Sequence, residues 1–427
     1  MLSKLAVAGA LATSVAALLM PTATPASAEE AVTGHTVVDR AAAVGLRTVG
    51  VETYTATPVD YNRDGRQDVW IGYHGHGGRL WKNRGNGTYA RVARTAWPSH
   101  TSHGGKIDRH DCAWADVDRN GLLDAYCSTG RMEANVVKGR RGNELWLQRR
   151  PGVFRETARQ WGVRDACGRG RQVVFFDANG DRYPDIFLGN DTPRDDPDDP
   201  CNVARNNLPN ERSKVFVNVR GTGFRYVRRG WSLPAGVGTL CAFRLDFDRD
   251  GWDDLFTCRP PGQAPRLYRN QHGRGFANVT ARHGLNSQIS GATLADLDLD
   301  GDQDVVTASN EGFGYHPNDG GRFRPLQLVA PIATGQGRSV AVADIDSDGD
   351  QDLYGMVGQG RSSNPDDQIW VNDGSAFTPL SVPPAEGAAD EVVALTPSRG
   401  RRPAFLVLNG FGPFEHGPVQ FIQVLRR

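Results

Sequence analysis

One short pattern of acidic residues recurs six times along the chain, and it constrains the fold more than any other feature. The fullest copy, DLDLDGDQD at residues 296–304, has aspartate at positions 1, 3, 5 and 9 and glycine at position 6. Carboxylates this close repel one another, whereas hard oxygen ligands crowded around a sharp turn are suited to Ca²⁺. We therefore predict about six calcium-binding loops. The predicted side-chain ligands are Asp60, Asn62, Asp64 and Asp68; Asp116, Asp118, Asn120 and Asp124; Asp177, Asn179, Asp181 and Asp185; Asp246, Asp248, Asp250 and Asp254; Asp296, Asp298, Asp300 and Asp304; and Asp344, Asp346, Asp348 and Asp352.

These loops differ from EF-hands, which need a bidentate glutamate at position 12. Position 12 is never acidic here, so aspartate at position 9 is the predicted fourth side-chain ligand. Strand-forming residues follow the loops, as in VWI at 69–71 and IFL at 186–188, which places each loop in a β-hairpin. An Asp/Gly-rich hairpin turn without metal is the plainer alternative, but six copies with one spacing disfavour it. The third loop departs from the pattern because its glycine is displaced to Gly180.

The loops begin about 50–70 residues apart, an interval that is typical of propeller blades. A second signature follows each loop: an apolar-aromatic pair and then Asn or a turn, as in LWKN at 80–83 and VFVN at 215–218, before a Gly-rich turn. This order indicates a strand, the acidic turn, a strand, a loop, a strand, a Gly turn and a strand. Four strands per repeat make one propeller blade.

A seventh repeat is present at the C-terminus without its ligands. When residues 392–395 are aligned with 341–344, the ligand positions are Leu395, Pro397, Arg399 and Pro403. Residues 417–424 supply a third strand, and the fourth is missing. Residues 37–46 at the N-terminus resemble the fourth-strand segments 154–163 and 276–285. We therefore predict an all-β, seven-bladed β-propeller with calcium-binding Asp loops in six blades and an N-terminal strand that closes the last blade.

These repeats resemble the FG-GAP/VCBS repeat family, which includes the integrin α-subunit propeller and many secreted bacterial propellers. The F-x-x-V-T-x-x-x-G-L pattern at residues 276–285 is also similar to ASPIC/UnbV-type proteins. The resemblance covers roughly residues 36–427. It implies a seven-bladed propeller with calcium in the turns between first and second strands. It implies no single activity, because members include adhesion proteins, lectins and polysaccharide-active enzymes.

The N-terminus predicts export. Residues 1–28 have the features of a secretory signal: Lys4, an apolar stretch at 5–20 and an A-x-A cleavage site at 26–28. We expect residues 29–427 to form a single secreted propeller domain with no further membrane span. Six cysteines in a secreted chain predict disulfides. Two pairs bracket the second and fourth loops and the remaining two are left for each other, which gives Cys112–Cys127, Cys241–Cys258 and Cys167–Cys201.

Long segments are expected on the propeller face opposite the Asp loops, where recognition would take place. Two of these segments, 72–79 and 97–111, carry five histidines: His74, His76, His100, His103 and His110. They could bind Zn²⁺ or Cu²⁺, or supply a general base next to Asp108 or Asp111. The plainer interpretation is that they are solvated loop histidines.

Charge and motifs narrow the function. The chain has 49 basic and 49 acidic residues, so filling the loops with Ca²⁺ would leave it cationic and attractive to anionic polymers. Nucleophile-elbow, phosphate-binding-loop and His-Glu-x-x-His motifs are absent. We expect a monomeric, non-enzymatic module that binds carbohydrate, cell-wall polymer or extracellular protein, and not nucleic acid, with calcium mainly structural. The alternatives are an extracellular polysaccharide lyase or hydrolase with a His-containing face, and a purely structural cell-surface module.

Overall fold

The computed structural model describes most of the unit Gly34–Arg427. The described residues are 35–74, 77–93, 97, 108–130, 142–191, 212–231, 233, 238–259, 263–285, 288–332, 335–358, 367–383, 390–396, 402–410 and 417–426. The predicted signal at 1–28 lies outside them and stays a prediction. The helices in this part of the chain are single turns, α1 (Ala41–Val44) and η2 (Thr280–Arg282), and none is a candidate membrane span.

Within the described residues, twenty-eight strands form seven antiparallel sheets of four, and the sheets follow one another along the chain. The first three are β2 (Thr53–Val59), β3 (Asp68–Tyr73), β4 (Arg79–Asn83) and β5 (Tyr89–Arg91); β6 (Arg109–Ala115), β7 (Asp124–Thr129), β8 (Glu144–Arg150) and β9 (Val153–Glu156); and β10 (Gly170–Phe176), β11 (Asp185–Asn190), β12 (Lys214–Asn218) and β13 (Phe224–Val227). The next three are β14 (Cys241–Leu245), β15 (Asp254–Cys258), β16 (Arg266–Asn270) and β17 (Phe276–Asn278); β18 (Ile289–Ala295), β19 (Asp304–Ser309), β20 (Gly312–His316) and β21 (Gln327–Pro331); and β22 (Gln336–Ala343), β23 (Asp352–Gly358), β24 (Gln368–Asn372) and β25 (Phe377–Ser381).

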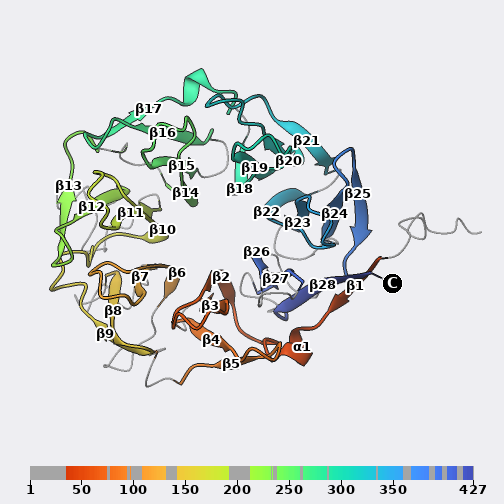
Figure 1. The fold of residues 1–427 in the computed structure, drawn as a ribbon, viewed down its shortest axis with the longest axis horizontal. Helices are drawn as coiled ribbons and strands as arrows, with labels where there is room; N and C mark the ends of the chain where they lie inside the picture. Colours follow the sequence, from red (N-terminus) through yellow and green to blue (C-terminus); the bar gives the residue numbers. More distant parts are fainter. Residues whose placement is uncertain are drawn as a thin grey trace, which may run out of the picture. The chain divides into compact units, whose positions relative to one another are not determined.

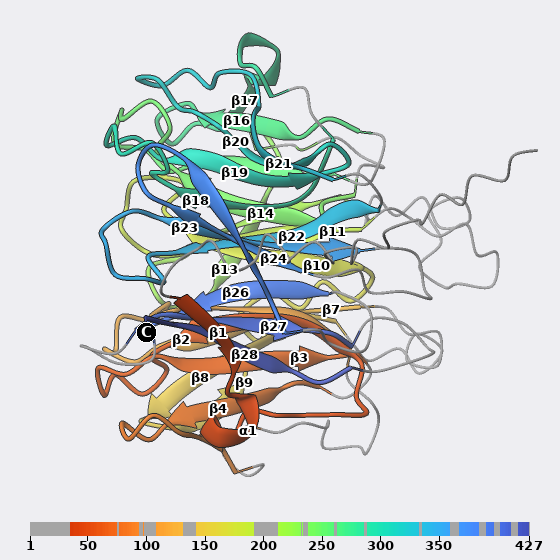
Figure 2. The ribbon, with the colours of Figure 1, turned by 90° about the vertical axis from the view of Figure 1, so that its right-hand side faces the viewer.

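The seventh sheet joins the two ends of the unit. It contains β26 (Glu391–Leu395), β27 (Ala404–Leu408), β28 (Gln420–Arg426) and the N-terminal strand β1 (His35–Asp39). Strand β1 pairs with β28, with Val37 opposite Val424, and Figure 2 shows the two side by side. The predicted closure of the last blade is thus confirmed, and closure covers the β28 edge that would otherwise be open to another strand.

The seven sheets are the blades of a propeller (Figure 1). The first strand of each blade is innermost, and each inner strand contacts the inner strands of the neighbouring blades around the ring. In this arrangement the acidic loops sit at the C-terminal ends of the inner strands. The N-terminal ends of the same strands lie at the opposite face.

The hydrophobic core lies between blades. One cluster, for example, packs Ile71 of the first blade against Leu406 and Phe421 of the seventh. Each second strand is covered by neighbouring blades on both faces, and β3, β7, β11, β15, β19 and β27 are buried along their whole length. This explains why segments such as DIFLGN read as continuous apolar runs rather than as alternating patterns.

Two disulfides fix the inner hairpins of the second and fourth blades. Cys112 and Cys127 face each other across β6 and β7, and Cys241 and Cys258 across β14 and β15. Both pairs were predicted from their positions around the acidic loops. Cys167 is also disulfide-bonded, and its predicted partner Cys201 lies outside the described residues.

Candidate functional site

Each acidic loop is a hairpin turn that needs two residues with positive φ. In the first loop these are Arg63 at position 4, with φ 55°, and Gly65 at position 6, with φ 79°. The third loop has Gly180 at position 4, with φ 75°, and Arg182 at position 6, with φ 66°. Glycine adopts this conformation without strain, so either position can use it. The displaced glycine of the third loop therefore keeps the same turn.

The position 1 and position 5 side chains shape the turn by accepting backbone hydrogen bonds. Asp60 Oδ1 accepts from the Asp64 N–H at 3.0 Å, and Asp60 Oδ2 accepts from the Gly65 N–H at 2.8 Å. The corresponding bonds in the third loop run from Asp181 and Arg182 to Asp177. Loops with Asn at position 3 thus have the same backbone framework as those with Asp.

Three carboxylates converge in four of the six loops. Their oxygen atoms lie within 4.8 Å of one another in the sets Asp116, Asp118 and Asp124; Asp246, Asp248 and Asp250; Asp296, Asp298 and Asp300; and Asp344, Asp346 and Asp348. Each set could hold an ion. The position 9 residues Asp254, Asp304 and Asp352 lie outside the last three sets, whereas Asp124 belongs to the first.

The aspartate at position 9 accepts hydrogen bonds from the backbone. Asp304 is fully buried; its Oδ2 accepts from the Leu297 N–H at 2.9 Å, and its Oδ1 accepts from the Asn318 N–H at 2.8 Å. Asp124, Asp185, Asp254 and Asp352 make the same two kinds of contact. The residue therefore ties its loop to the end of the third strand.

Burial without a counter-charge has an electrostatic consequence. Burial, together with the charges of neighbouring carboxylates and opposed by the two backbone hydrogen bonds, raises the pKa of Asp124, Asp185, Asp254 and Asp352 to about 7 and that of Asp304 to about 6. A bound cation would favour the ionised form instead. Burial and like-charge repulsion thus disfavour the ionised carboxylates of the loops, and a bound divalent cation would stabilise them.

Some oxygen atoms of the triads have unused hydrogen-bonding capacity. Asp248 Oδ1 and Asp296 Oδ1 are buried without a hydrogen-bond partner. The Arg269 guanidinium contacts Asp248 and Asp250 at their Oδ2 atoms, at 2.5 and 2.8 Å, and makes no hydrogen bond to Asp248 Oδ1. A buried oxygen without a partner is costly, and a hard cation is the ligand that such carboxylate sets take. The residues fit Ca²⁺.

The two described histidines of the predicted group come together at the other face. His74, which follows β3, and His110, in β6, both contact Asp108, with His110 Nε2 3.1 Å from Asp108 Oδ2. Asp111 instead accepts from the Val173 N–H at 2.8 Å and takes no part in this group. His76, His100 and His103 lie outside the described residues.

An open cavity of about 680 Å³ lies at the Asp-loop end of the inner strands β6, β10, β14 and β18. Its wall combines the aromatic side chains of Trp114, Phe175 and Phe243 with the charged side chains of Arg182 and Arg244. This cavity was not predicted from the sequence. The sequence feature that could have indicated the cavity is the residue two places before an acidic loop. Although these residues lie in inner strands, they remain partly or largely exposed: Trp114, Phe175, Arg244 and Leu294.

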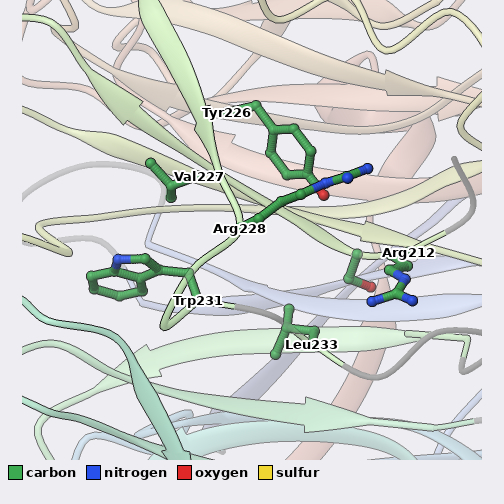
Figure 3. Close-up of a pocket in the computed structure, with 7 residues that line it drawn as sticks. Arg212, Tyr226, Val227, Arg228, Trp231 and Leu233 are labelled. Carbon is green, nitrogen blue, oxygen red and sulfur yellow. The ribbon is translucent and has the colours of Figure 1, made fainter. Parts of the chain in front are cut away.

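A second cavity is too small for a ligand of comparable size. Its volume is about 100 Å³, and Figure 3 shows it beside β13, with Tyr226, Arg228 and Trp231 around it. The Arg228 guanidinium lies 5.4 Å from the Tyr226 ring centroid, so a cation–π contact occupies part of this region.

Comparisons with known proteins support the repeat assignment. A family model for FG-GAP-like repeats matches residues 60–127, 246–307 and 296–355. A search of curated proteins found no match. Among solved structures, the chain is similar to an Agrocybe aegerita lectin described as recognising non-reducing terminal N-acetylglucosamine, with 19% identity and a TM-score of 0.50 over 78% of this chain and 80% of that one.

A second similar structure is BBS1N in complex with ARL6DN, with 10% identity and a TM-score of 0.51 over 89% of this chain and 95% of that one. At these identities the likeness concerns the fold alone. The matched segments include five of the six acidic loops, and the sheets form a closed ring of seven. The chain therefore carries FG-GAP-like repeats in a seven-bladed β-propeller.

Proposed function

We propose that this protein is a secreted carbohydrate-binding propeller whose six Asp loops bind Ca²⁺. The carbohydrate would occupy the 680 Å³ cavity at the Asp-loop end of the inner strands. The observation that carries this proposal is the composition of the cavity wall. Aromatic rings pack against the apolar faces of sugar rings, and charged groups such as Arg182 and Arg244 bind hydroxyls or acidic substituents.

The size of the cavity is consistent with a saccharide ligand. Ligand sites are usually about 300–1,000 Å³, so the cavity is large enough for a short saccharide. The long segments on the opposite face, where we predicted recognition from the sequence, lie largely outside the described residues. One of the similar structures is a lectin described as recognising non-reducing terminal N-acetylglucosamine, which supports a carbohydrate ligand.

Calcium would act on the cavity indirectly. Asp177, Arg182 and Tyr183 belong to the third acidic loop and also line the cavity. The Arg119 guanidinium of the second loop lies 3.8 Å from the centroid of the Tyr183 ring, so the two loops support each other there. Calcium in these loops would fix the cavity wall. Extracellular millimolar calcium can fill even sites of modest affinity.

The first experiment is binding of the mature, calcium-loaded protein to an array of glycans and cell-wall polymers. We expect retention on a defined set of saccharides, at least tenfold weaker with Trp114→Ala and largely retained with Trp114→Phe. Arg244→Ala should weaken acidic ligands, whereas Arg282→Ala, at an exposed site on η2, should not. Unchanged binding by Trp114→Ala would remove the cavity from the proposal, and a blank array would redirect it to a protein ligand.

A polysaccharide lyase or hydrolase is the second candidate, and the histidine group favours it. His110, Tyr54 and Asp108 lie together, and a histidine beside a carboxylate can act as a general base. The same array spots, inspected for shortened or unsaturated products, distinguish the two functions. Cleavage that is lost with His74→Ala would establish the enzyme, and retention without cleavage would support the binding protein.

A further inference from the structure

His74, Asp108 and His110 form a group that is separate from the acidic loops. The group lies at the N-terminal end of the inner strand β6, whereas the acidic loop follows its C-terminal end. At about 3.3 Å per residue, a seven-residue strand such as β6 separates the two by about 20 Å. The residues come from two blades, since His74 follows β3, Asp108 directly precedes β6 and His110 lies in β6.

The three side chains present their ligand atoms to a common point. Asp108 contacts His74 Nδ1 through Oδ1 and His110 Nε2 through Oδ2, the latter at 3.1 Å. The imidazole rings have centroids 5.2 Å apart and are inclined by 72°. The three candidate ligand atoms lie within 4.8 Å of one another. Ligand atoms bonded to one tetrahedral ion at about 2.0 Å would be roughly 3.3 Å apart, so small side-chain shifts suffice.

One of the two contacts of His110 brings two hydrogen-bond acceptors together unless a proton or a metal ion lies between them. His110 Nδ1 lies 2.7 Å from the Gly170 carbonyl oxygen, which can only accept, so Nδ1 carries a hydrogen. In the neutral ring, Nε2 then presents a lone pair to the Asp108 carboxylate, which is also an acceptor. The other neutral tautomer would instead place a lone pair against the carbonyl. A second proton on the ring, a proton on the carboxylate, or a metal ion between Nε2 and the carboxylate removes the conflict.

The two residues of this contact are buried: only 4% of each of the His110 and Asp108 side chains is exposed. A histidine that donates its other ring N–H to a backbone carbonyl has the usual orientation of a metal ligand.

We propose that His74 Nδ1, Asp108 and His110 Nε2 bind one divalent transition-metal ion of the Zn²⁺ class. Two imidazoles and one carboxylate suit Zn²⁺ and its neighbours rather than Ca²⁺, which takes oxygen ligands. The His74 side chain is 34% exposed, so the ion would be open on that side to water or to an oxygen donor of an external ligand.

The surroundings are shaped to admit this group. Gly130 stands where a Cβ would lie 2.3 Å from Asp108 Oδ2 and 2.4 Å from His110 Nε2, so no side chain can occupy this position. The Tyr54 ring stacks on His110 with centroids 4.4 Å apart and rings inclined by 20°, which holds the imidazole in place. The nearby guanidinium of Arg171 pairs with Asp191 at 2.7 Å, which offsets the positive charge that would oppose a bound cation.

The test is calorimetric titration of Zn²⁺ into the full mature protein, stripped with EDTA and returned to millimolar Ca²⁺ so that the acidic loops are saturated. We expect one tight Zn²⁺ equivalent. His74→Ala, at a partly exposed residue after a strand, should weaken it by roughly 100-fold or more, and Asp108→Asn should act alike. His272→Ala is the matched control, because His272 is an exposed histidine 3.3 Å from a carboxylate, Asp250, on the other face. It should leave the tight equivalent unchanged.

Two further readouts separate a metal site from a protonated histidine pair. Co²⁺ in the same site should give visible d–d absorption without a thiolate charge-transfer band, and His74→Ala should abolish the spectrum. Equal Zn²⁺ affinity in wild type and His74→Ala would overturn the proposal, as would the absence of a tight equivalent. Nitrogen NMR of the calcium-loaded protein showing both His110 ring nitrogens protonated at pH 8 would likewise assign the group to an imidazolium that is only structural.

Discussion

The aspartate at the ninth position of each loop is both a candidate calcium ligand and a hydrogen-bond acceptor for the backbone. In five of the six loops its two oxygens accept N–H groups from position 2 of its own loop and from the end of the third strand, as Asp304 does from Leu297 and Asn318. In the first loop, Asp68 Oδ1 accepts from the Asn83 N–H, and Asp68 Oδ2 is buried without a hydrogen-bond partner. Each carboxylate oxygen has two lone pairs, so these contacts leave capacity for an ion. The partner-free oxygens of Asp248 and Asp296 are therefore the better markers of where the ion binds.

Asp296→Asn should lower the melting temperature when calcium is present and should leave it unchanged or raise it when calcium is removed. With Ca²⁺, the variant loses one charged ligand at a buried atom and should melt several degrees below wild type. With EDTA, it loses one of three mutually repelling carboxylates and should match or exceed wild type. Thermal unfolding of both proteins under both conditions checks this prediction. Equal melting temperatures with Ca²⁺ would contradict ion binding at the fifth loop.

Glu391 at the start of β26 should make stability depend on pH. Its Oε2 accepts from the Ala56 N–H at 2.7 Å, and burial raises its pKa from 4.5 to about 7. A carboxyl with a raised folded-state pKa binds its proton more tightly when folded, so its contribution is greatest at low pH and is lost as pH rises from about 4.5 to 7. Glu391→Gln should therefore gain about 2 kcal/mol relative to wild type between pH 5 and pH 8. Urea unfolding in Ca²⁺ at both values measures this; a constant difference would contradict it.

At the scale of the element, one side chain links each of several blades to the preceding acidic loop. The amide at the end of the third strand donates to the position 2 carbonyl of that loop: Gln148 to Tyr61, Asn218 to Val117, Asn270 to Ala178 and Asn318 to Phe247, at 2.9–3.0 Å. The same Asn residues accept an N–H from the following Gly turn. We call this contact the blade latch. It explains the Asn that recurs at the end of the third strand.

Asn270→Ala tests the blade latch. The substitution removes donation to Ala178 and Asp253 and acceptance from Gly273, and it leaves a buried carbonyl without its partner. We expect a loss of roughly 2–4 kcal/mol in urea unfolding. Asn86→Ala is the control, because Asn86 is exposed and makes only local turn contacts to Thr88 among its described interactions. Similar losses for both variants would contradict the latch.

At the scale of the whole molecule, ring closure by β1 determines whether seven sheets make a stable unit. The first and seventh blades share one hydrophobic cluster, in which Leu46 just after α1 is fully buried. The chain ends are therefore held by pairing and by packing at once. Without β1, the β28 strand would present unpaired backbone groups at the rim of the ring.

A truncation that begins at residue 40 should expose this edge. It lacks β1 (His35–Asp39) and should lower the melting temperature and form concentration-dependent oligomers through β28. A truncation that begins at residue 35 retains β1 and is the matched control, which should stay monomeric. Light scattering across a range of protein concentrations makes the comparison. A monomeric, equally stable protein from residue 40 would show that β1 is dispensable.

The fold was predictable because it rests on local, repeated information. A nine-residue loop pattern and the strand formers after it define a hairpin wherever they occur, and the resemblance of residues 37–46 to fourth strands sufficed to predict the closure by β1. The same reasoning paired Cys112 with Cys127 and Cys241 with Cys258, because each pair flanks one hairpin. It could not show that position 9 serves the backbone, since Asn318 lies 14 residues from Asp304.

The blades, the acidic turns and their order were predictable from the sequence, because each depends on residues close together in the chain. What lies at the ends of the inner strands depends on how the blades pack around the ring. The cavity takes its wall from four blades, and the metal-site candidate takes His74 from one blade and His110 from the next. The five histidines could not be distinguished in the sequence, because a side chain's distance to a residue in another blade depends on this packing and not on spacing along the chain.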